Sequence, residues 1–379
     1  MNHLRITALV LFCNALLLAG GCSNAASGPQ PQASTTPEQQ PVGGTTTVAE
    51  TKYFTGSIGN SLGLQMKLIR RGDELTGSYF YKKIGTSIEL RGTIDKGGKV
   101  TLEEFDPGGK RTGTFSGKWQ ADKGEELVTI AGDWSKPDSS SKTPFSLQEQ
   151  PVYFTQGIDI VAKQIKESNK KLKYELAAEY PELTGPIGAN HVKFNREVRA
   201  LVQKKVSAFK KDVAGPDGFE TPGEAMGNDL GISYVLAFAN DDLISIEFDV
   251  GSYYAGAAHP NSYSEVVNYD LKNGKLLRLG DLFQPGTKYL ESIAAYCIKD
   301  LKRQSKTRDS MLDDESIESG AAPKAENYES WTITRKGLAI TFDAYQVGPY
   351  AAGPQHVVVP YSAVQNIVNS QGVLAQFTK

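Results

Sequence analysis

Residues 249–290 read DVGSYYAGAAHPNSYSEVVNYDLKNGKLLRLGDLFQPGTKYL, and this segment decides the fold of the C-terminal half. Apolar and polar side chains alternate over residues 244–250, which is typical of a half-buried strand, and residues 266–269 resume a strand. The pair Asn273-Gly274 predicts a turn, because it readily adopts positive φ. Thr287 then follows a Pro-Gly pair and is the expected N-cap of a helix that buries Leu290, Ile293, Cys297 and Leu301.

The same patterns continue on both sides of this segment. Residues 158–166 and 173–183 predict a strand hairpin, with a helix as the alternative for the first, and residues 191–211 predict an amphipathic helix. Residues 233–239 and 263–269 predict further antiparallel strands, and residues 331–361 are expected to pair with the opening segment. The polar residues 303–328 are expected to form an exposed surface segment. Residues 151–379 are therefore predicted to be an α+β domain, with an antiparallel sheet packed by two main helices.

Three stretches of this domain resemble a known family: GSYYAGAAHP (251–260), NYDLKNGKLLRLGDLF (268–283) and WTITRKGLAITFDAYQVGPYAAGPQHVVVPYSAV (331–364). They resemble the extracytoplasmic domain of the RsiV-type anti-sigma factors, a domain that also accompanies certain peptidoglycan deacetylases. The resemblance covers residues 158–368. In the anti-sigma factors of this family the domain binds lysozyme. In the deacetylases, catalysis belongs to a separate domain of the same protein. The resemblance therefore implies a binding domain. Fold is therefore better indicated than function.

Residues 52–150 have a different pattern, with about eight short alternating segments separated by glycine-containing turns. This spacing predicts an all-β antiparallel meander closed into a small barrel or sandwich. Gly-x-aromatic recurs, ending at Tyr79, Phe115, Trp119 and Trp134. These rings are expected in the core of the meander, and the alternative is a ligand-binding face.

The N-terminus has the features of a secreted lipoprotein. Residues 1–21 read as a signal peptide with an apolar run and a small-residue cleavage site, and Cys22 follows as in a bacterial lipobox; the alternative is a plain signal peptide. Residues 22–51 contain no aromatic side chain and are rich in Pro, Gln, Thr and Ser. This composition predicts a disordered tether, lipidated at Cys22. Since no aspartate follows Cys22, we expect an outer-membrane anchor, with the protein facing the periplasm.

The composition limits the function classes. With a formal net charge of −2, the chain lacks the excess of basic residues that is typical of a nucleic-acid-binding protein. The mature chain has three histidines, none paired at metal-binding helical spacing, and it lacks HExxH, CxxC and Gly-x-Ser-x-Gly. Cys297 lies on the apolar stripe of its helix and is expected to be a buried, inert thiol. We therefore expect no cofactor and no metal.

The candidate binding residues lie on two stretches rich in Tyr, His, Gly and Pro. His259 is the best catalytic candidate, but a histidine in a tight connection more often binds or hydrogen-bonds its own loop. Aromatic side chains commonly dominate interfaces. The predicted binding surface comprises Tyr253, Tyr254, His259, Tyr345, Tyr350 and His356.

The expected function is that of a lipid-anchored envelope protein that binds a cell-wall glycan or a lysozyme-like protein without catalysis. The alternative is a wall-acting hydrolase with its site around His259. We do not expect an anti-sigma factor, because only about five residues precede the apolar segment, which is short for a membrane span.

We predict that Cys22→Ala converts the protein to a soluble or uncleaved form, because the lipid is attached through this thiol. Membrane fractionation with high-salt and carbonate washes measures the change, and Cys13→Ala, within the signal peptide, is the control. A correctly processed Cys22→Ala protein that stays in the washed membranes would contradict the prediction.

Overall fold

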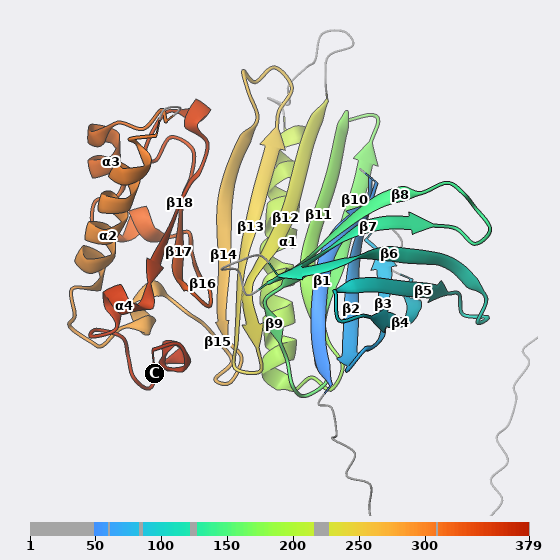
Figure 1. Cartoon of the computed structure of the whole chain (residues 1–379). Helices are drawn as coiled ribbons and strands as arrows, with labels where there is room; N and C mark the ends of the chain where they lie inside the picture. Colours follow the sequence, from blue (N-terminus) through green and yellow to red (C-terminus); the bar gives the residue numbers. More distant parts are fainter. Residues whose placement is uncertain are drawn as a thin grey trace, which may run out of the picture. The chain divides into compact units, whose positions relative to one another are not determined.

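Eight antiparallel strands, β1 to β8, form a closed barrel, in which β1 pairs with β8 as well as with β2 (Figure 1). The computed structural model describes residues 49–59, 61–82, 86–121, 127–215, 227–307 and 310–378. The predicted signal peptide, Cys22 and nearly all of the predicted tether lie outside the described residues. The barrel strands are Glu50–Ile58, Leu62–Arg71, Glu74–Tyr81, Ile88–Ile94, Lys99–Phe105, Arg111–Ala121, Val128–Ser135 and Thr143–Gln150. The predicted all-β meander is confirmed, and it closes as a barrel.

Alternating side chains fill the inside of the barrel. Tyr79 and Phe115 are buried and meet edge to face, with 5.4 Å between ring centroids, while Trp119 and Trp134 are only partly buried. The buried carboxylate of Glu104 accepts hydrogen bonds from the Tyr79 hydroxyl (2.6 Å) and from Trp134 Nε1 (3.0 Å). Two of the four recurring aromatic residues are thus core residues, as expected, and a third hydrogen-bonds a core carboxylate.

A seven-stranded sheet follows the barrel (Figure 1). Its strands, in chain order, are β9 (Val152–Tyr153), β10 (Asp159–Asn169), β11 (Tyr174–Thr184), β12 (Asn228–Asn240), β13 (Leu243–Tyr253), β14 (Asn261–Asp270) and β15 (Lys275–Leu276). The predicted strands, including the hairpin, are confirmed, so the helix alternative for residues 158–166 is wrong. Two neighbouring pairs, β11–β12 and β9–β12, are parallel. The first arises because helix α1 (Ala189–Ala214) carries the chain back between the two strands.

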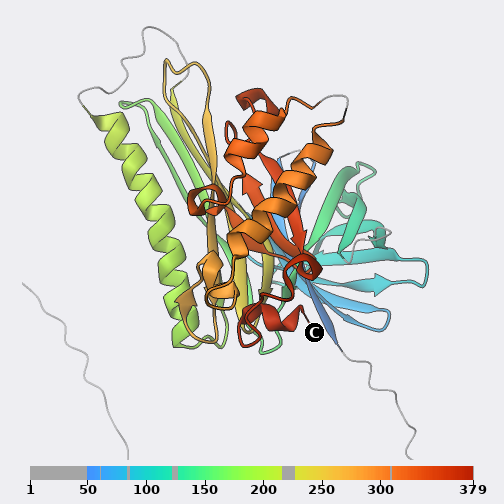
Figure 2. The ribbon, with the colours of Figure 1, turned by 90° about the vertical axis from the view of Figure 1, so that its left-hand side faces the viewer.

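Helix α1 covers one face of the large sheet, as Figure 2 shows. Its apolar stripe packs against the sheet and is buried at Phe194, Val198, Val202, Val206, Phe209 and Val213. Ile244 and Ile246 of β13 belong to the same core, so the side chain between them, Ser245, lies on the opposite face of the strand.

The remainder of the chain forms a C-terminal lobe with its own sheet of three strands, β16, β17 and β18, and its own core (Figure 1). The prediction that residues 331–361 pair with the opening segment is therefore wrong: they pack against its sheet instead. The lobe comprises η1 (Leu279–Leu282), α2 (Tyr289–Gln304), α3 (Asp314–Gly320), η2 (Ala325–Tyr328), β16 (Trp331–Ile333), β17 (Gly337–Phe342), η3 (Tyr350–Ala352), β18 (Gln355–Pro360), α4 (Tyr361–Val364) and η4 (Val373–Gln376).

The segment 303–328 is not simply an exposed surface segment. It contains α3 and η2, and Ile317, Ala321 and Tyr328 are buried in the core of the lobe. The Tyr328 hydroxyl donates to the carbonyl of Ala321 at 2.7 Å. Single apolar residues among many charges are therefore enough to anchor this segment.

A buried polar cluster joins the lobe to the large sheet. Ser245 Oγ donates to Asn268 Oδ1 (2.5 Å), and Asn268 Nδ2 donates to the carbonyl of Trp331 (2.8 Å). The backbone N–H of Ile333 donates to Ser245 Oγ at 2.8 Å. Ser245 and Asn268 are opposite one another on β13 and β14, and both are buried. We call this the Ser245–Asn268 clasp; it positions the three-stranded sheet on the face of β13–β14 that α1 leaves open.

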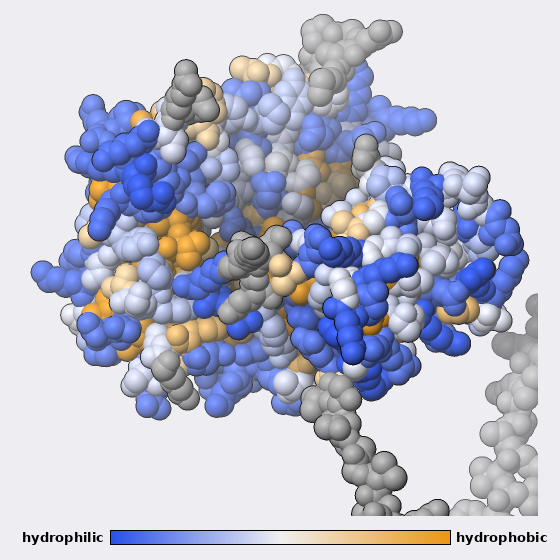
Figure 3. Space-filling view, viewed as in Figure 1, coloured by the Kyte–Doolittle hydropathy of each residue, from blue (hydrophilic) through white to orange (hydrophobic). Residues whose placement is uncertain are grey.

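All described residues belong to one compact unit. Hydrophilic side chains cover most of the surface visible in Figure 3. The described helices include none with the length and apolar content needed to cross a membrane.

We predict that Asn268→Ala lowers the free energy of unfolding by about 2–4 kcal/mol, because it leaves buried groups on Ser245 and Trp331 without their partner. Chemical denaturation followed by circular dichroism measures the change. Asn261→Ala, at the exposed start of the same strand, is the control and should change the value by less than about 0.5 kcal/mol. Equal effects of the two substitutions would show that the clasp contributes nothing.

We also predict that Cys297 resists alkylation in the folded protein. Its thiol is buried in α2, and burial raises its pKa to about 12, so almost no thiolate is present at pH 8. Mass spectrometry of the Cys297 peptide after iodoacetamide treatment checks this, with the guanidinium-unfolded protein as control. Rapid modification of the native protein would be contrary to this prediction.

Candidate functional site

Three of the predicted binding residues, His259, Tyr345 and Tyr350, come together on the surface; we call them the aromatic cluster. The rings of His259 and Tyr350 are stacked, with 4.1 Å between centroids and an interplanar angle of 27°. The ring of Tyr345 lies 5.4 Å from that of Tyr350 and 6.4 Å from that of His259. Tyr345 is 65% exposed, so the cluster presents an aromatic face to solvent.

The carbonyl of Pro260 organises the cluster. It accepts hydrogen bonds from the Tyr350 hydroxyl (2.9 Å) and from His259 Nδ1 (2.8 Å). Because a carbonyl only accepts, Nδ1 carries a proton, while Nε2 lies 3.3 Å from the Tyr345 hydroxyl. Both ring nitrogens of His259 are thus engaged within the cluster, and neither contacts a carboxylate in the described residues.

The turn that carries Tyr345 is strained. Tyr345 has φ of 74°, a left-handed conformation that a bulky residue rarely adopts. Its neighbour Gln346 holds the turn in place, donating from Nε2 to the carbonyls of Gly320 (3.1 Å) and Asn327 (2.9 Å). The Asp343 carboxylate accepts from the backbone N–H of Ser264 on β14. Such strain persists only where surrounding contacts fix it, and it is common at binding sites.

Tyr253, Tyr254 and His356 make different contacts. The ring of Tyr254 packs on Phe209 of α1, and its hydroxyl donates to Asp212 (3.2 Å); burial and the Asp212 charge raise its pKa to about 12. Tyr253 pairs with Asp229 in the sheet, and by strand alternation it lies on the face away from α1. His356, on β18, has Nδ1 3.2 Å from Thr341 Oγ1, and that hydroxyl donates to Glu247. The aromatic cluster therefore contains three of the six predicted residues.

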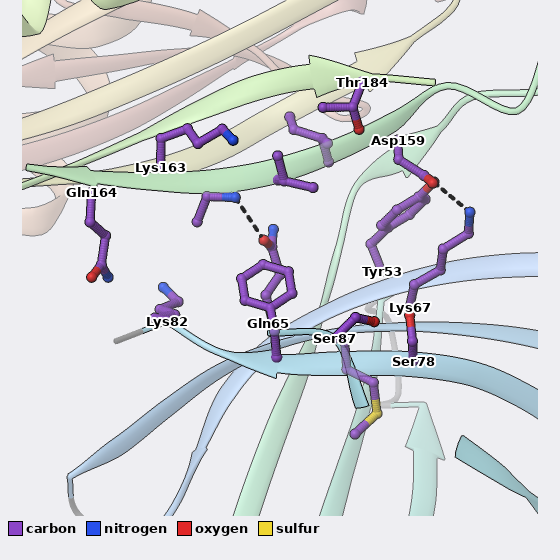
Figure 4. A pocket seen from close by; sticks show the side chains of 15 residues that line it. Tyr53, Gln65, Lys67, Ser78, Lys82, Ser87, Asp159, Lys163, Gln164 and Thr184 are labelled. Atoms are coloured by element: carbon purple, nitrogen blue, oxygen red, sulfur yellow. Dashed lines mark hydrogen bonds and ion pairs between the residues drawn. The ribbon is translucent and has the colours of Figure 1, made fainter. Parts of the chain in front are cut away.

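A second feature, which the sequence did not reveal, is a cavity of about 590 Å³ between the barrel strands β2 and β3 and the strand β10 (Figure 4). Lys67 pairs with Asp159, which also accepts from the Tyr53 hydroxyl (2.7 Å). At the other end, Lys82 pairs with Glu179 at 2.7 Å. Alternation along β2 indicates that Gln65 and Lys67 face outward, but no sequence pattern indicates that β10 lies opposite them.

The described residues contain no group of three or more His, Cys, Asp or Glu side chains that would hold a metal ion. The chemistry that the aromatic cluster offers is ring stacking and hydrogen bonding through hydroxyl and imidazole groups. The cavity is lined by hydroxyl, amide and paired ionic groups and by Phe80.

Several curated proteins are similar to part of this chain. The peptidoglycan-N-acetylmuramic acid deacetylase PdaC of Bacillus subtilis is 26% identical over 179 residues, which cover 47% of this chain and 37% of PdaC. The esterase Rv3036c of Mycobacterium tuberculosis is 28% identical over 109 residues, 29% of this chain and 45% of the esterase. The immunogenic protein MPT64 of the same species is 26% identical over 114 residues, 30% and 47% of the two chains. The chain thus spans less than half the length of these relatives.

Two solved structures of the DUF3298 family are also similar. One, from Bacteroides fragilis, has 18% identity and a TM-score of 0.41, and the match covers 58% of this chain and 97% of that one. The other, from Pseudomonas aeruginosa, has 16% identity and a TM-score of 0.39, covering 56% and 94%. The expected likeness to a peptidoglycan deacetylase is confirmed by the match to PdaC, while that to RsiV-type anti-sigma factors stays a prediction. Residues 280–362 match the model of DUF3298, a family of proteins of unknown function.

Proposed function

We propose that this protein is a lipid-anchored component of the bacterial cell envelope, on the outer membrane and facing the periplasm, that binds a wall glycan without catalysis. The observation that carries the proposal is the exposed aromatic cluster of His259, Tyr345 and Tyr350. Rigid aromatic rings offer a large contact area and lose little conformational entropy on binding. Sugar rings have apolar faces that stack on such rings, and hydroxyl groups that pair with tyrosine and histidine.

The similarity to PdaC supports a wall ligand, because PdaC is a deacetylase of peptidoglycan. Cys22 and the signal peptide support the anchor, since lipidation would hold the folded part near the wall. A lysozyme-like protein, the partner implied by the anti-sigma resemblance, is the other ligand to be tested.

A wall-acting hydrolase with a site around His259 is the second candidate. The similarity to an esterase and the contact between Tyr345 and His259 Nε2 favour it. However, the histidine of a nucleophile–base pair is usually oriented by a third group, most often a carboxylate. In the described residues no carboxylate contacts His259, and its Nδ1 donates to the carbonyl of Pro260. We therefore prefer binding to catalysis.

We predict that Tyr350→Ala weakens binding to insoluble peptidoglycan about tenfold, and that Tyr345→Ala does the same, because the first removes a half-buried ring of the cluster and the second an exposed one. Co-sedimentation with purified peptidoglycan measures affinity, and thermal melting measures stability. A parallel pull-down with lysozyme tests whether the protein binds this alternative ligand.

Tyr254→Ala is the matched control for these two variants. It should lower the melting temperature, because Tyr254 packs on α1, but leave the affinity of the folded protein unchanged. If Tyr350→Ala instead lowered stability by several degrees with unchanged affinity, the cluster would be structural and the proposal wrong. Release of reducing sugar or acetate by the wild-type protein, lost in His259→Ala, would favour the hydrolase.

A further inference from the structure

Strand β10 forms an edge of the large sheet, because β11 is its only strand partner among the described residues. Ala162 lies opposite Pro181, which has no N–H, and the N–H of Ala162 points away from β11 to Gln65 of the barrel. Backbone groups of alternate residues point the same way along a strand. The N–H and C=O groups of Gln164, Lys166 and Ser168 therefore also point away from β11, along the outer edge.

The barrel closes this edge at one point with a side-chain amide. Gln65 Oε1 accepts from the N–H of Ala162 at 3.0 Å, and Gln65 is only 6% exposed. A carboxamide has the same donor and acceptor groups as a peptide bond. Gln65 thus stands where the carbonyl of a neighbouring strand would lie, and the edge beyond it, from Gln164 onward, has no strand beside it in the described part of the chain.

The cavity opens next to the start of that free edge. Figure 4 shows Gln164 and Lys82 at one end of it, with Gln65 in the middle and Lys67 at the other end. Phe80, Ile160 and Val161 supply apolar surface, and Ser78, Ser87 and Thr184 supply hydroxyl groups. A volume of about 590 Å³ lies within the usual range of roughly 300–1,000 Å³ for ligand pockets. It is large enough for a side chain that arrives along the edge.

The free part of β10 and the turn after it are basic. Lys166, Lys170 and Lys171 are exposed, and in the described residues no carboxylate forms an ion pair with any of them. By contrast, Lys67, Lys82 and Lys163 each have a carboxylate partner, in Asp159, Glu179 and Glu182. Lys166 shares a surface hollow with the exposed carboxylates of Glu175 and Asp229. The uncompensated charge therefore lies mainly at Lys170 and Lys171, in the turn at the end of the open edge, and it favours an acidic ligand there.

We propose that the edge of β10 binds an extended acidic peptide segment of a partner protein. The segment adds to the large sheet as a further strand next to Gln164, Lys166 and Ser168, and places a side chain in the cavity beside Phe80. Backbone hydrogen bonds supply affinity, and the cavity and the lysines supply specificity. This site is distinct from the aromatic cluster and goes beyond the proposed wall-binding function.

The same lysines also oppose pairing of this edge with the edge of a second copy of the chain. Lysines on an edge strand oppose edge-to-edge association, because two copies bring like charges together. An acidic segment removes this repulsion, so the charge that blocks self-association selects the partner.

The test uses a fluorescein-labelled peptide of about ten residues that alternates glutamate and threonine, titrated with the full chain and followed by fluorescence anisotropy. Lys166→Pro removes an N–H that points outward and leaves the ladder with β11 intact. Its matched control is Lys166→Ala, which removes the same charge but keeps the N–H. We expect Lys166→Pro to bind about five- to tenfold more weakly than Lys166→Ala. Circular dichroism and thermal melting establish that both variants are folded.

A second measurement leaves the protein unchanged. Peptides N-methylated at alternate amides lose donors on one edge only, so one set should bind about as the parent does and the other set at least tenfold more weakly. The proposal is overturned if the parent peptide does not bind, if both methylated sets bind equally, or if Lys166→Pro and Lys166→Ala have the same affinity. It is also overturned if the chain dimerises and Lys166→Pro abolishes the dimer, since a second copy then occupies the edge.

Discussion

The Ser245–Asn268 clasp is the contact on which the arrangement of the C-terminal half depends. It lies between two layers, where water cannot satisfy polar groups, so each of its groups must find a partner in the protein. The geometry that satisfies them fixes Trp331 and Ile333 over β13 and β14. The loop with His259 and the turn with Tyr345 extend from these two layers. The aromatic cluster is therefore a consequence of the clasp as much as of its own side chains.

Local patterns predicted most of the fold. Glycine turns and alternation predicted the barrel, and the 3.6-residue period predicted α1 and α2, because these signals depend on neighbouring residues. The lobe was harder: β16 and β17 have the composition of central strands, and nothing local indicates which sheet they join. Ile317 and Tyr328 were missed because their apolar character is diluted by adjacent charges.

The aromatic cluster and the cavity likewise differ in how far the sequence predicts them. The stretches containing His259, Tyr345 and Tyr350 were recognisable from composition, and the structure brings these residues together. Tyr254 lies in a stretch of similar composition, but its side chain points toward α1 and packs on Phe209. The direction of this side chain depends on strand register, which composition does not indicate. The cavity beside β10 was beyond sequence reasoning, since residues about a hundred positions apart form its two walls.

The order of strands in the barrel affects how the chain folds. Each of its strands pairs with the next along the sequence, so one long-range pairing, β1 with β8, completes it. The large sheet has a parallel pair, β11–β12, whose strands meet only after α1 has crossed between them. Contacts between near neighbours in sequence form faster than distant ones. During synthesis from the N-terminus, the barrel, with Gln65 and Lys67 on its outer wall, can therefore assemble before the large sheet that contains β10 is complete.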